Sequence, residues 1–162
     1  EDTGERRWGS REVEITSVQM LDARGNAGWL FHDDEAVTVE VGYRINSPVS
    51  DLVFGIGILR ADGLDVHGAN TAIDDIDAPL PASSETTLPL FGVFRYRIDR
   101  LGLLENTYYL DAAVHKKDGF PFDYHHRQYK FSVKSQHAYS GVLNPRHSWE
   151  LAPGYRIQAD EI

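Results

Sequence analysis

The sequence has no cysteine and a single methionine among its 162 residues. The missing thiols exclude disulfides, thiolate metal sites and a cysteine nucleophile, and a cysteine-free chain fits a reducing compartment. Basic residues are also few, since 16 Lys and Arg stand against 25 Asp and Glu, for a formal net charge of −9. Nucleic acids and anionic membrane surfaces both require a basic footprint, so neither is an expected partner.

Long apolar runs are missing too. No stretch approaches the ~20 apolar residues needed to cross a bilayer. The N-terminal residues 1–7 carry no hydrophobic core of a signal peptide, and no helical spacing is sustained long enough for a core helix. What remains is one domain, in which 41% hydrophobic and 25% charged residues are ordinary for a globular protein.

Apolar residues instead recur at every second position, the pattern of a half-buried β-strand. Four such rows span residues 37–45, 88–98, 108–114 and 129–133. Turn-forming residues separate the rows, with glycine, asparagine, aspartate or proline at the expected places. With roughly seven to nine strands, the sequence predicts an all-β fold, an antiparallel β-sandwich of immunoglobulin-like type, with a jelly roll as the alternative.

Two local signals refine this prediction. Val13 and Ile15 are followed by apolar Val18 and Met20, so the alternation changes phase and predicts a β-bulge near residues 16–17. Residues 101–110 have the pattern of a tight corner that enters a strand. A buried Tyr108 at this point is expected to form a hydrogen bond from its hydroxyl to the backbone of the corner, as in immunoglobulin-like sandwiches.

The stretch FGIGILRADGLDVHGANT, residues 54–71, alternates bulky apolar residues with glycine. Gly55 and Gly57 leave one face of this strand bare, while Phe54, Ile56 and Ile58 fill the other. Because glycine weakens a strand, something is expected to approach the bare face closely. Two interpretations stay open: a covering strand or bulky neighbour, or the floor of a ligand groove.

The same alternation predicts a polar face suited to sugars, which are bound by aromatic faces and by side chains that bond hydroxyl groups. In the row 108–114 the small Ala113 leaves a hollow between Asp111 and His115, both expected to be exposed. Side chains of a neighbouring strand would border this hollow. The candidate carbohydrate-binding residues are Tyr109, Asp111 and His115, with Arg95 and Arg97 or Tyr124 and His126 as the bordering pairs, and His67 and Asn70 in addition.

Motifs for catalysis or metal binding are weak or missing. His125 and His126 form the densest histidine cluster, but adjacent strand residues point to opposite faces and cannot readily share one ion. They are expected to be surface or rim histidines. The acidic residues 73–77 lack the spacing of a calcium loop, and no G-x-S-x-G, G-x-G-x-x-G or Walker motif occurs. The sequence therefore predicts no enzyme, no metal and no cofactor in this domain.

Several segments, in their order and spacing, resemble one family. They are RWGS at 7–10, VEITSV at 13–18, VFGIGI at 53–58, GANT at 68–71, NTYYL at 106–110, GVL at 141–143 and HSWE at 147–150. Over residues 7–150 the chain resembles the C-terminal domain of Wzt-type proteins, the nucleotide-binding subunits of ABC transporters that export O-antigen polysaccharide. The resemblance implies a non-catalytic module of immunoglobulin-like topology that recognises the exported glycan, often at its non-reducing end.

The resemblance also implies an organisation and a set of partners. Residues 1–10 would be a linker from an upstream ATPase domain that holds ATP and magnesium, residues 11–150 the carbohydrate-binding sandwich, and residues 151–162 a C-terminal tail. A homodimer would form by exchange of a C-terminal strand over about 138–149, and the full-length protein would contact the transmembrane subunit of the exporter. The implied location is the cytoplasmic side of the bacterial inner membrane.

Some positions within the match have more ordinary interpretations. Asn70 and Thr71 suit turn capping as well as ligand binding. Trp8 and Trp149 are expected to anchor the two ends, while Trp29 is either a sugar platform or part of a packed loop. Two other functions are weighed against glycan recognition: a structural immunoglobulin-like dimerisation module, and a small cupin-like metal-dependent enzyme, which the histidine spacing disfavours.

Overall fold

A computed structural model describes residues 6–80 and 87–151, and within these ranges the chain forms nine β-strands and no helix. This confirms the predicted all-β class. The strands are β1 (Arg7–Trp8), β2 (Val13–Leu21), β3 (Leu30–His32), β4 (Val37–Ile45), β5 (Val53–Arg60), β6 (Asp65–Asn70), β7 (Leu90–Ile98), β8 (Asn106–His115) and β9 (Pro121–Lys134).

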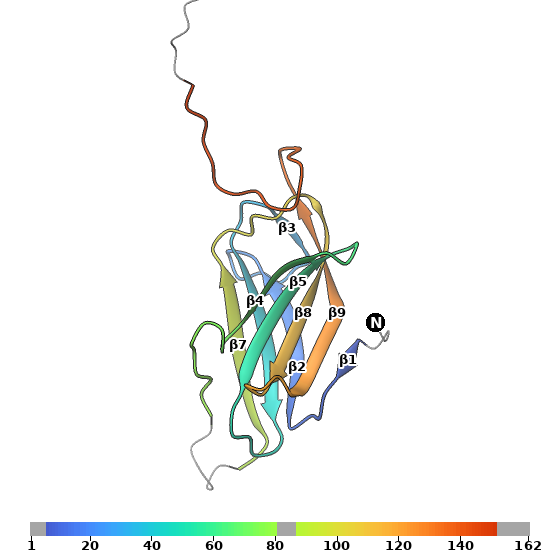
Figure 1. The fold of residues 1–162 in the computed structure, drawn as a ribbon, viewed down its shortest axis with the longest axis vertical. Coiled ribbons are helices and arrows are strands. Elements are labelled where there is room, and N and C mark those ends of the chain that lie inside the picture. The colour runs from blue at the N-terminus through green and yellow to red at the C-terminus, as the bar shows by residue number, and fades with distance from the viewer. Residues whose placement is uncertain (1–5, 81–86, 152–162) are drawn as a thin grey trace, which may run out of the picture.

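The strands form two sheets that pack face to face. One sheet has the order β1-β9-β8-β5-β6, with β3 added in parallel along β9, and the other has the order β2-β4-β7. In Figure 1, β5, β8 and β9 pass in front of β2 and β4. Setting the short strands aside, the chain order within the two sheets is that of the immunoglobulin sheets GFCC′ and ABE, so the predicted immunoglobulin-like sandwich is confirmed.

The local predictions are confirmed as well. The four alternating rows become β4, β7, β8 and β9. The register of β2 against β4 shifts between Ile15 and Ser17, where the phase change predicted a bulge. The Tyr108 hydroxyl donates a 2.6 Å hydrogen bond to the carbonyl oxygen of Leu104, which closes the tyrosine corner before β8.

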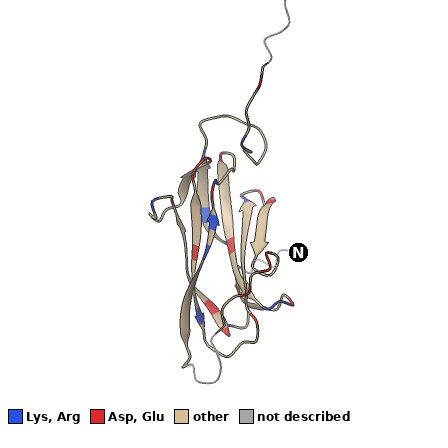
Figure 2. Ribbon diagram, turned by 90° about the vertical axis from the view of Figure 1, so that its left-hand side faces the viewer, with Lys and Arg blue, Asp and Glu red and all other residues tan. Residues whose placement is uncertain are grey.

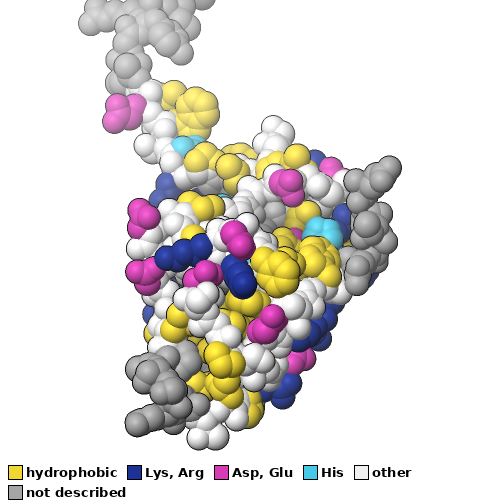
Figure 3. Space-filling view, turned by 60° about the horizontal axis from the view of Figure 1, so that its bottom comes forward, with side chains coloured by type: hydrophobic (Ala, Val, Ile, Leu, Met, Phe, Trp, Pro, Cys, Tyr) yellow, Lys and Arg dark blue, Asp and Glu magenta, His cyan; other side chains and the backbone are white. Residues whose placement is uncertain are grey.

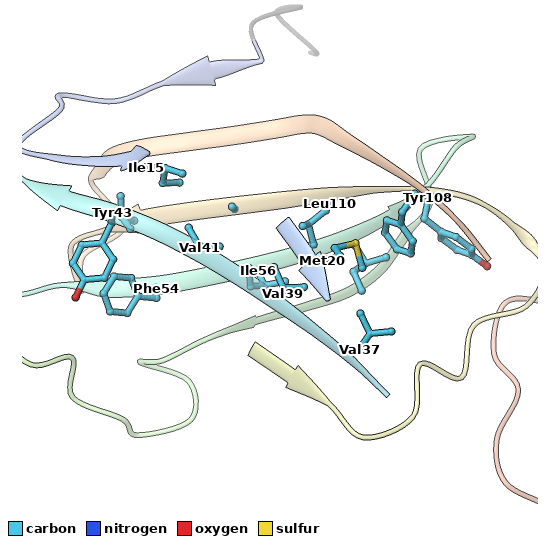
Figure 4. Close-up of a cluster of buried hydrophobic side chains, with 14 of the residues drawn as sticks. Ile15, Met20, Val37, Val39, Val41, Tyr43, Phe54, Ile56, Tyr108 and Leu110 are labelled. Atoms are coloured by element: carbon cyan, nitrogen blue, oxygen red, sulfur yellow. The ribbon is translucent and has the colours of Figure 1, made fainter. Parts of the chain in front are cut away.

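The core lies between the two sheets, where inward residues of β2 and β4 pack against those of β5 and β8 (Figure 4). Val39, Val41 and Leu110 are fully buried, and burial of each such side chain contributes about 1.5–3 kcal/mol. Packing also explains a glycine in β7. A Cβ at Gly92 would lie 2.3 Å from the ring of Tyr43, so the tyrosine can lie over β7 only because this position has no side chain.

The ends of the folded unit differ in part from expectation. Arg7 and Trp8 already belong to the sheet as β1, ahead of the boundary predicted at residue 11. Over 138–149, the expected exchanged strand, the chain forms no named strand, although Leu143 makes an isolated bridge with Leu103. Most of the predicted tail at 151–162 lies outside the described residues.

Charged residues of both signs are interspersed over strands and loops in the view of Figure 2. No helix in the described ranges is long and apolar enough to cross a membrane.

Candidate functional site

A groove of about 510 Å³ lies on the outer face of the larger sheet, on the side away from the core. Its floor is the glycine-rich part of β5, and one wall is β6. The opposite wall is formed by Asp111, Ala113 and His115 of β8 together with Tyr124 of β9. Ligand pockets typically measure about 300–1,000 Å³, so the groove has the size of a ligand site.

The glycines of β5 create this groove and also admit a close neighbour. A Cβ at Gly57 would lie 3.3 Å from the Cβ of Asp111, and a Cβ at Gly55 would lie 3.7 Å from the Cβ of Ala113. The bare face of β5 therefore serves in part both roles considered from the sequence, as the site of a close neighbour and as the floor of a groove. The side chains of β8 approach the glycines from one side, and the remaining space forms the groove floor, with a hollow at Ala113 where the alternation predicted one.

Asp111 is buried, with 5% of its surface exposed, and the expectation of an exposed carboxylate is wrong. The reason is an irregularity in β9, whose register against β8 shifts between Leu110 and Ala112. There Arg127 adopts a φ of 50°, and its N–H donates a 2.7 Å hydrogen bond to Asp111 Oδ1. His126 Nδ1 lies 2.8 Å from Oδ2. The carboxylate thus holds the β9 irregularity in place beside the groove.

Tyr124 is the aromatic side chain of the groove wall. Burial, and the nearby carboxylate of Asp111, raise the pKa of Tyr124 to about 12, so the phenol stays neutral at physiological pH. Its hydroxyl lies 3.4 Å from Asp111 Oδ2. On its other side the ring stacks on Trp8, with centroids 4.6 Å apart and planes inclined by 7°. Tyr124 is therefore fixed from two directions.

His115 and Tyr109 lie on the same sheet face in different settings. His115 Nδ1 lies 2.7 Å from the carbonyl oxygen of Lys116, which can only accept, so Nδ1 carries the proton and Nε2 remains as the ring's second polar atom. Tyr109 does not line the groove, and the guanidinium of Arg127 lies 5.0 Å from the centroid of its ring. Of the two, only His115 reaches the groove.

The two predicted residues of β6 have structural partners. His67 Nε2 lies 2.7 Å from the hydroxyl of Tyr96 and thus links β6 to β7 at the edge of the sandwich. Asn70 Oδ1 accepts a 2.8 Å hydrogen bond from the N–H of Ile73, and Thr71 Oγ1 accepts one of 3.1 Å from the N–H of Phe54. Asn70 thus caps the turn after β6, Thr71 ties the chain to β5, and His67 and Asn70 also border the groove.

Arg95 and Arg97 lie on a different sheet from the candidates of β8 and β9, although Arg95 lines a separate hollow of about 130 Å³ with Asn70. They lie on β7, which pairs with β4 in the smaller sheet, and Arg95 Nε donates a 2.6 Å hydrogen bond to Glu40. Of the two alternative bordering pairs, the structure brings Tyr124 and His126 beside β8 and leaves the arginines on the other sheet. Strand alternation fixes which face a residue takes within its own strand, but it carries no information on which strands are neighbours.

The paired histidines point to opposite faces, as the alternation predicted. His126 bonds the outward Asp111, while His125 is 4% exposed and its Nδ1 lies 2.5 Å from the Tyr129 hydroxyl. His125 is thus a buried residue, and its expected place at the rim is wrong. Within the described residues, no three His, Cys, Asp or Glu side chains are placed to hold a metal ion.

Sequence reasoning missed a second buried carboxylate, Asp123, which is fully buried beneath β1. It accepts hydrogen bonds from Arg7 Nε at 3.0 Å, from the N–H of Ile15 at 2.8 Å and from Arg11. Burial alone would raise the pKa of Asp123, but the neighbouring His125, Arg7 and the Ile15 N–H outweigh burial and hold it well below its usual range. The local pattern gave no signal of this burial, because apolar Phe122 and Tyr124 on either side place Asp123 on the opposite face of the strand.

The fold and the groove define an immunoglobulin-like sandwich with a polar, ligand-sized hollow on one sheet. The sequence matches the Wzt C-terminal domain family over residues 4–145, and the chain belongs to that family. It is 28% identical over 147 residues to an O-antigen export system ATP-binding protein of Myxococcus xanthus, RfbB, covering 91% of this chain. The chain spans 31% of that relative's length.

A solved structure agrees with the fold. The crystal structure of the C-terminal domain of Wzt superimposes with a TM-score of 0.75, at 18% identity, over 93% of this chain and 90% of the other. At this level of identity the likeness establishes a shared fold.

Proposed function

We propose that this domain is a non-catalytic carbohydrate-binding module that recognises O-antigen polysaccharide, at its non-reducing end, for export by an ABC transporter. Membership of the Wzt C-terminal domain family supports the proposal, as does the O-antigen export relative. The observation that carries it is the glycine-floored groove on the outer sheet face. The full-length protein would then carry an ATPase domain with ATP and magnesium, and act with a transmembrane subunit at the cytoplasmic side of the inner membrane.

The chemistry of the groove suits a sugar. The glycine floor lets a flat ring approach the backbone, and Tyr124, Asp65 and His115 supply an aromatic edge, a carboxylate and an imidazole around it. The aromatic face is negative and attracts the weakly positive C–H groups of a sugar ring, while the polar groups bond hydroxyls. Water competes for these contacts, so the dissociation constant is expected on the order of micromolar to millimolar.

The direct test fills the groove without disturbing the fold. Gly68 lies opposite Gly57 on β6 and lines the groove, and a Cβ there would meet no atom within 4 Å. Gly68→Val therefore places a branched side chain in the groove and leaves folding intact. Gly28→Val is the matched control, since a Cβ at Gly28 also has open space and lies away from the groove.

Calorimetric titration with the O-polysaccharide of the host strain is expected to show affinity about tenfold weaker or more for Gly68→Val, and unchanged affinity for Gly28→Val. Equal affinity of Gly68→Val and Gly28→Val would show that the polysaccharide binds outside the groove. A polysaccharide trimmed at its non-reducing terminus is titrated as well. Loss of binding to the trimmed chain indicates recognition of the end, and equal binding indicates recognition of the repeat unit. Failure of the unaltered domain to bind either polysaccharide at millimolar sugar would reject glycan recognition.

A structural dimerisation module is the second candidate. The observation in its favour is the chain after Asn144, which leads away from the sandwich (Figure 1) and exposes Trp149 and Leu151 by 84% and 83%. Such side chains suit contact with another copy through an exchanged C-terminal segment. Sedimentation of the unaltered domain and of a form ending at Asn144 tests this: a dimer that depends on the segment, without glycan affinity, would favour dimerisation as the main role.

A further inference from the structure

A second hollow continues from the groove toward the N-terminal strand. It measures about 310 Å³ and is lined by Trp8, His115, Gly119, Pro121 and Tyr124. His115 and Tyr124 line the groove as well, so the two hollows share a wall and form one surface on the same sheet face. In the view of Figure 3, hydrophobic side chains gather beside a histidine, among acidic and basic ones.

Trp8 is held in a fixed position within this second hollow. It is the register partner of Tyr124 in the pairing of β1 with β9, and its ring stacks parallel on the tyrosine. The preceding residue, Arg7, donates hydrogen bonds from Nε and Nη2 to the buried Asp123 at 3.0 and 2.8 Å. The pairing of β1 with β9, the stack on Tyr124 and the hydrogen bonds of Arg7 thus fix the indole. Its half-buried ring lines the hollow. A residue that only anchored the end of the chain would not need its ring held in one orientation.

We propose that the second hollow is a second sugar subsite, with Trp8 as its platform, that binds the glycan residue next to the one in the groove. This inference rests on the proposed function. A rigid aromatic face costs little conformational entropy on binding and attracts the C–H face of a pyranose. His115, between the two hollows, offers its Nε2 to a hydroxyl of either sugar. The domain therefore reads at least two consecutive residues.

The lining also specifies the class of sugar. None of the described residues that line this hollow is Asp, Glu, Lys or Arg, so the subsite has no fixed charge with which to pair. A phosphorylated or uronic residue would lose water there without gaining a partner. The subsite is accordingly built for an uncharged pyranose, whereas the groove, with Asp65 and Asp111 in its lining, accepts a residue rich in hydroxyl donors.

The test compares fragments of the host O-polysaccharide of different lengths. A fragment covering the groove alone, a single sugar residue, is titrated beside fragments of two and more residues. The unaltered domain is expected to bind the longer fragments about tenfold more tightly than the single residue. Trp8→Ala should abolish this gain, while Trp8→Phe, which keeps a ring stacked on Tyr124, should retain part of it and leave the affinity for the single residue unchanged.

Trp29→Ala is the matched control, because Trp29 is also a partly exposed indole stacked on a tyrosine, with its centroid 6.1 Å from that of Tyr129, and it lines neither hollow. Its affinities should equal those of the unaltered domain. A form with Trp29 and Trp149 both changed to Phe leaves Trp8 as the single tryptophan. Its emission should shift to shorter wavelength with the longer fragments, and should stay constant with the single residue.

The outcomes separate the two proposals. If the unaltered domain binds single and longer fragments equally, or if Trp8→Phe and Trp8→Ala weaken all fragments alike, the second subsite is rejected and the groove stands. If the unaltered domain binds no fragment and no intact polysaccharide, both proposals fall. A length-dependent gain that Trp8→Ala abolishes and Trp29→Ala keeps, with an emission shift, establishes the subsite.

Discussion

Two of the buried aspartates lie on neighbouring strands, Asp111 on β8 and Asp123 on β9, with 5% and 0% of their surfaces exposed. Asp123 faces the N-terminal part of the chain, where Arg7, Arg11 and the N–H of Ile15 bond its oxygens. Asp111 faces the groove, and bonds side chains and backbone of the following strand only. Two aspartates of similar burial thus have different roles, because one contacts the N-terminal part of the chain and the other lies beside the groove.

The difference lies in the partners. Guanidinium groups are permanently charged and form strong, directed hydrogen bonds with a carboxylate, so Asp123 ties β1 and β2 to β9 across more than 100 residues of sequence. Asp111 bonds an imidazole and an amide, and a phenol lies nearby. Of these partners, Tyr124 lines the groove, and His126 and Arg127 lie on the same strand, β9. Asp123 therefore ties the N-terminal strands to the rest of the fold, and Asp111 positions one wall of the groove.

The largest effect is expected from removing the charge of Asp123. Asp123→Asn leaves Arg7 and Arg11 beside a neutral, buried amide, and breaking such an ion pair costs about 3 kcal/mol. The free energy of unfolding, measured by urea denaturation, should fall by about this amount. Glycan affinity of the folded protein should change little at the groove, because none of its lining residues bonds Asp123.

The control for this variant is Asp62→Asn. Asp62 also pairs with an arginine, since its Oδ2 lies 2.7 Å from Arg60 Nη2, but it is exposed. An exposed pair is screened by water and salt, so its loss should hardly change the free energy of unfolding. Equal destabilisation by the two variants would show that burial of Asp123 is not what makes its pairing matter.

The second effect concerns Asp111. Asp111→Asn keeps an oxygen for the N–H of Arg127 but replaces the charged acceptor of His126 with a neutral group. Stability should fall by about 1 kcal/mol, the scale of one hydrogen bond. Affinity for the O-polysaccharide should fall about tenfold, because His126 and Tyr124 lose their common anchor. Urea denaturation and calorimetric titration, done on the same preparation, measure the two quantities.

A reversed pattern, with large loss of stability and intact affinity, would make Asp111 a structural residue like Asp123. His126→Gln sharpens the test, since glutamine retains a donor for the carboxylate. Its affinity should lie between those of the unaltered domain and of Asp111→Asn.

The smallest effect is the response to acid. The pKa of Asp123 is lowered in the folded state, so its contribution to stability is fully present above the ordinary pKa of about 3.9 and is lost as the pH falls toward the folded value. The unaltered domain should lose stability from about pH 5 downward. Asp123→Asn lacks this contribution, so its unfolding free energy should fall less steeply between pH 5 and 3. Parallel curves would mean that Asp123 has no lowered pKa.

Much of the fold could be predicted from the sequence, because a strand in a sandwich obeys a local rule. Alternation of Val37, Val39 and Val41 with polar residues assigns each side chain to a face without knowledge of any neighbour. The change of phase at residues 16–17 locates the bulge, and Tyr108 locates the corner. The glycines of β5 correctly indicated that a neighbour, here β8, comes close to the outer face of this strand.

The site was predicted only in outline, because its composition depends on strand neighbours. Alternation cannot tell whether β7 or β9 lies beside β8, and it placed Arg95 among the candidates on equal terms with Tyr124. It also could not foresee that the irregularity of β9 turns His126 and Arg127 toward Asp111 and so buries a carboxylate on an outer face. Trp8 was expected to anchor the chain end, and its stack on Tyr124 requires the pairing of residues 116 positions apart.

The sequence by itself determined the strands, their inner and outer faces, the corner and the bare glycine surface, since each of these follows from steric and apolar patterns within a few residues. The tertiary structure alone decided which outer residues meet. The groove wall, the fixed indole of Trp8 and the separate roles of the two aspartates all come from contacts between segments far apart in the chain, which form only when both sheets close over the common core.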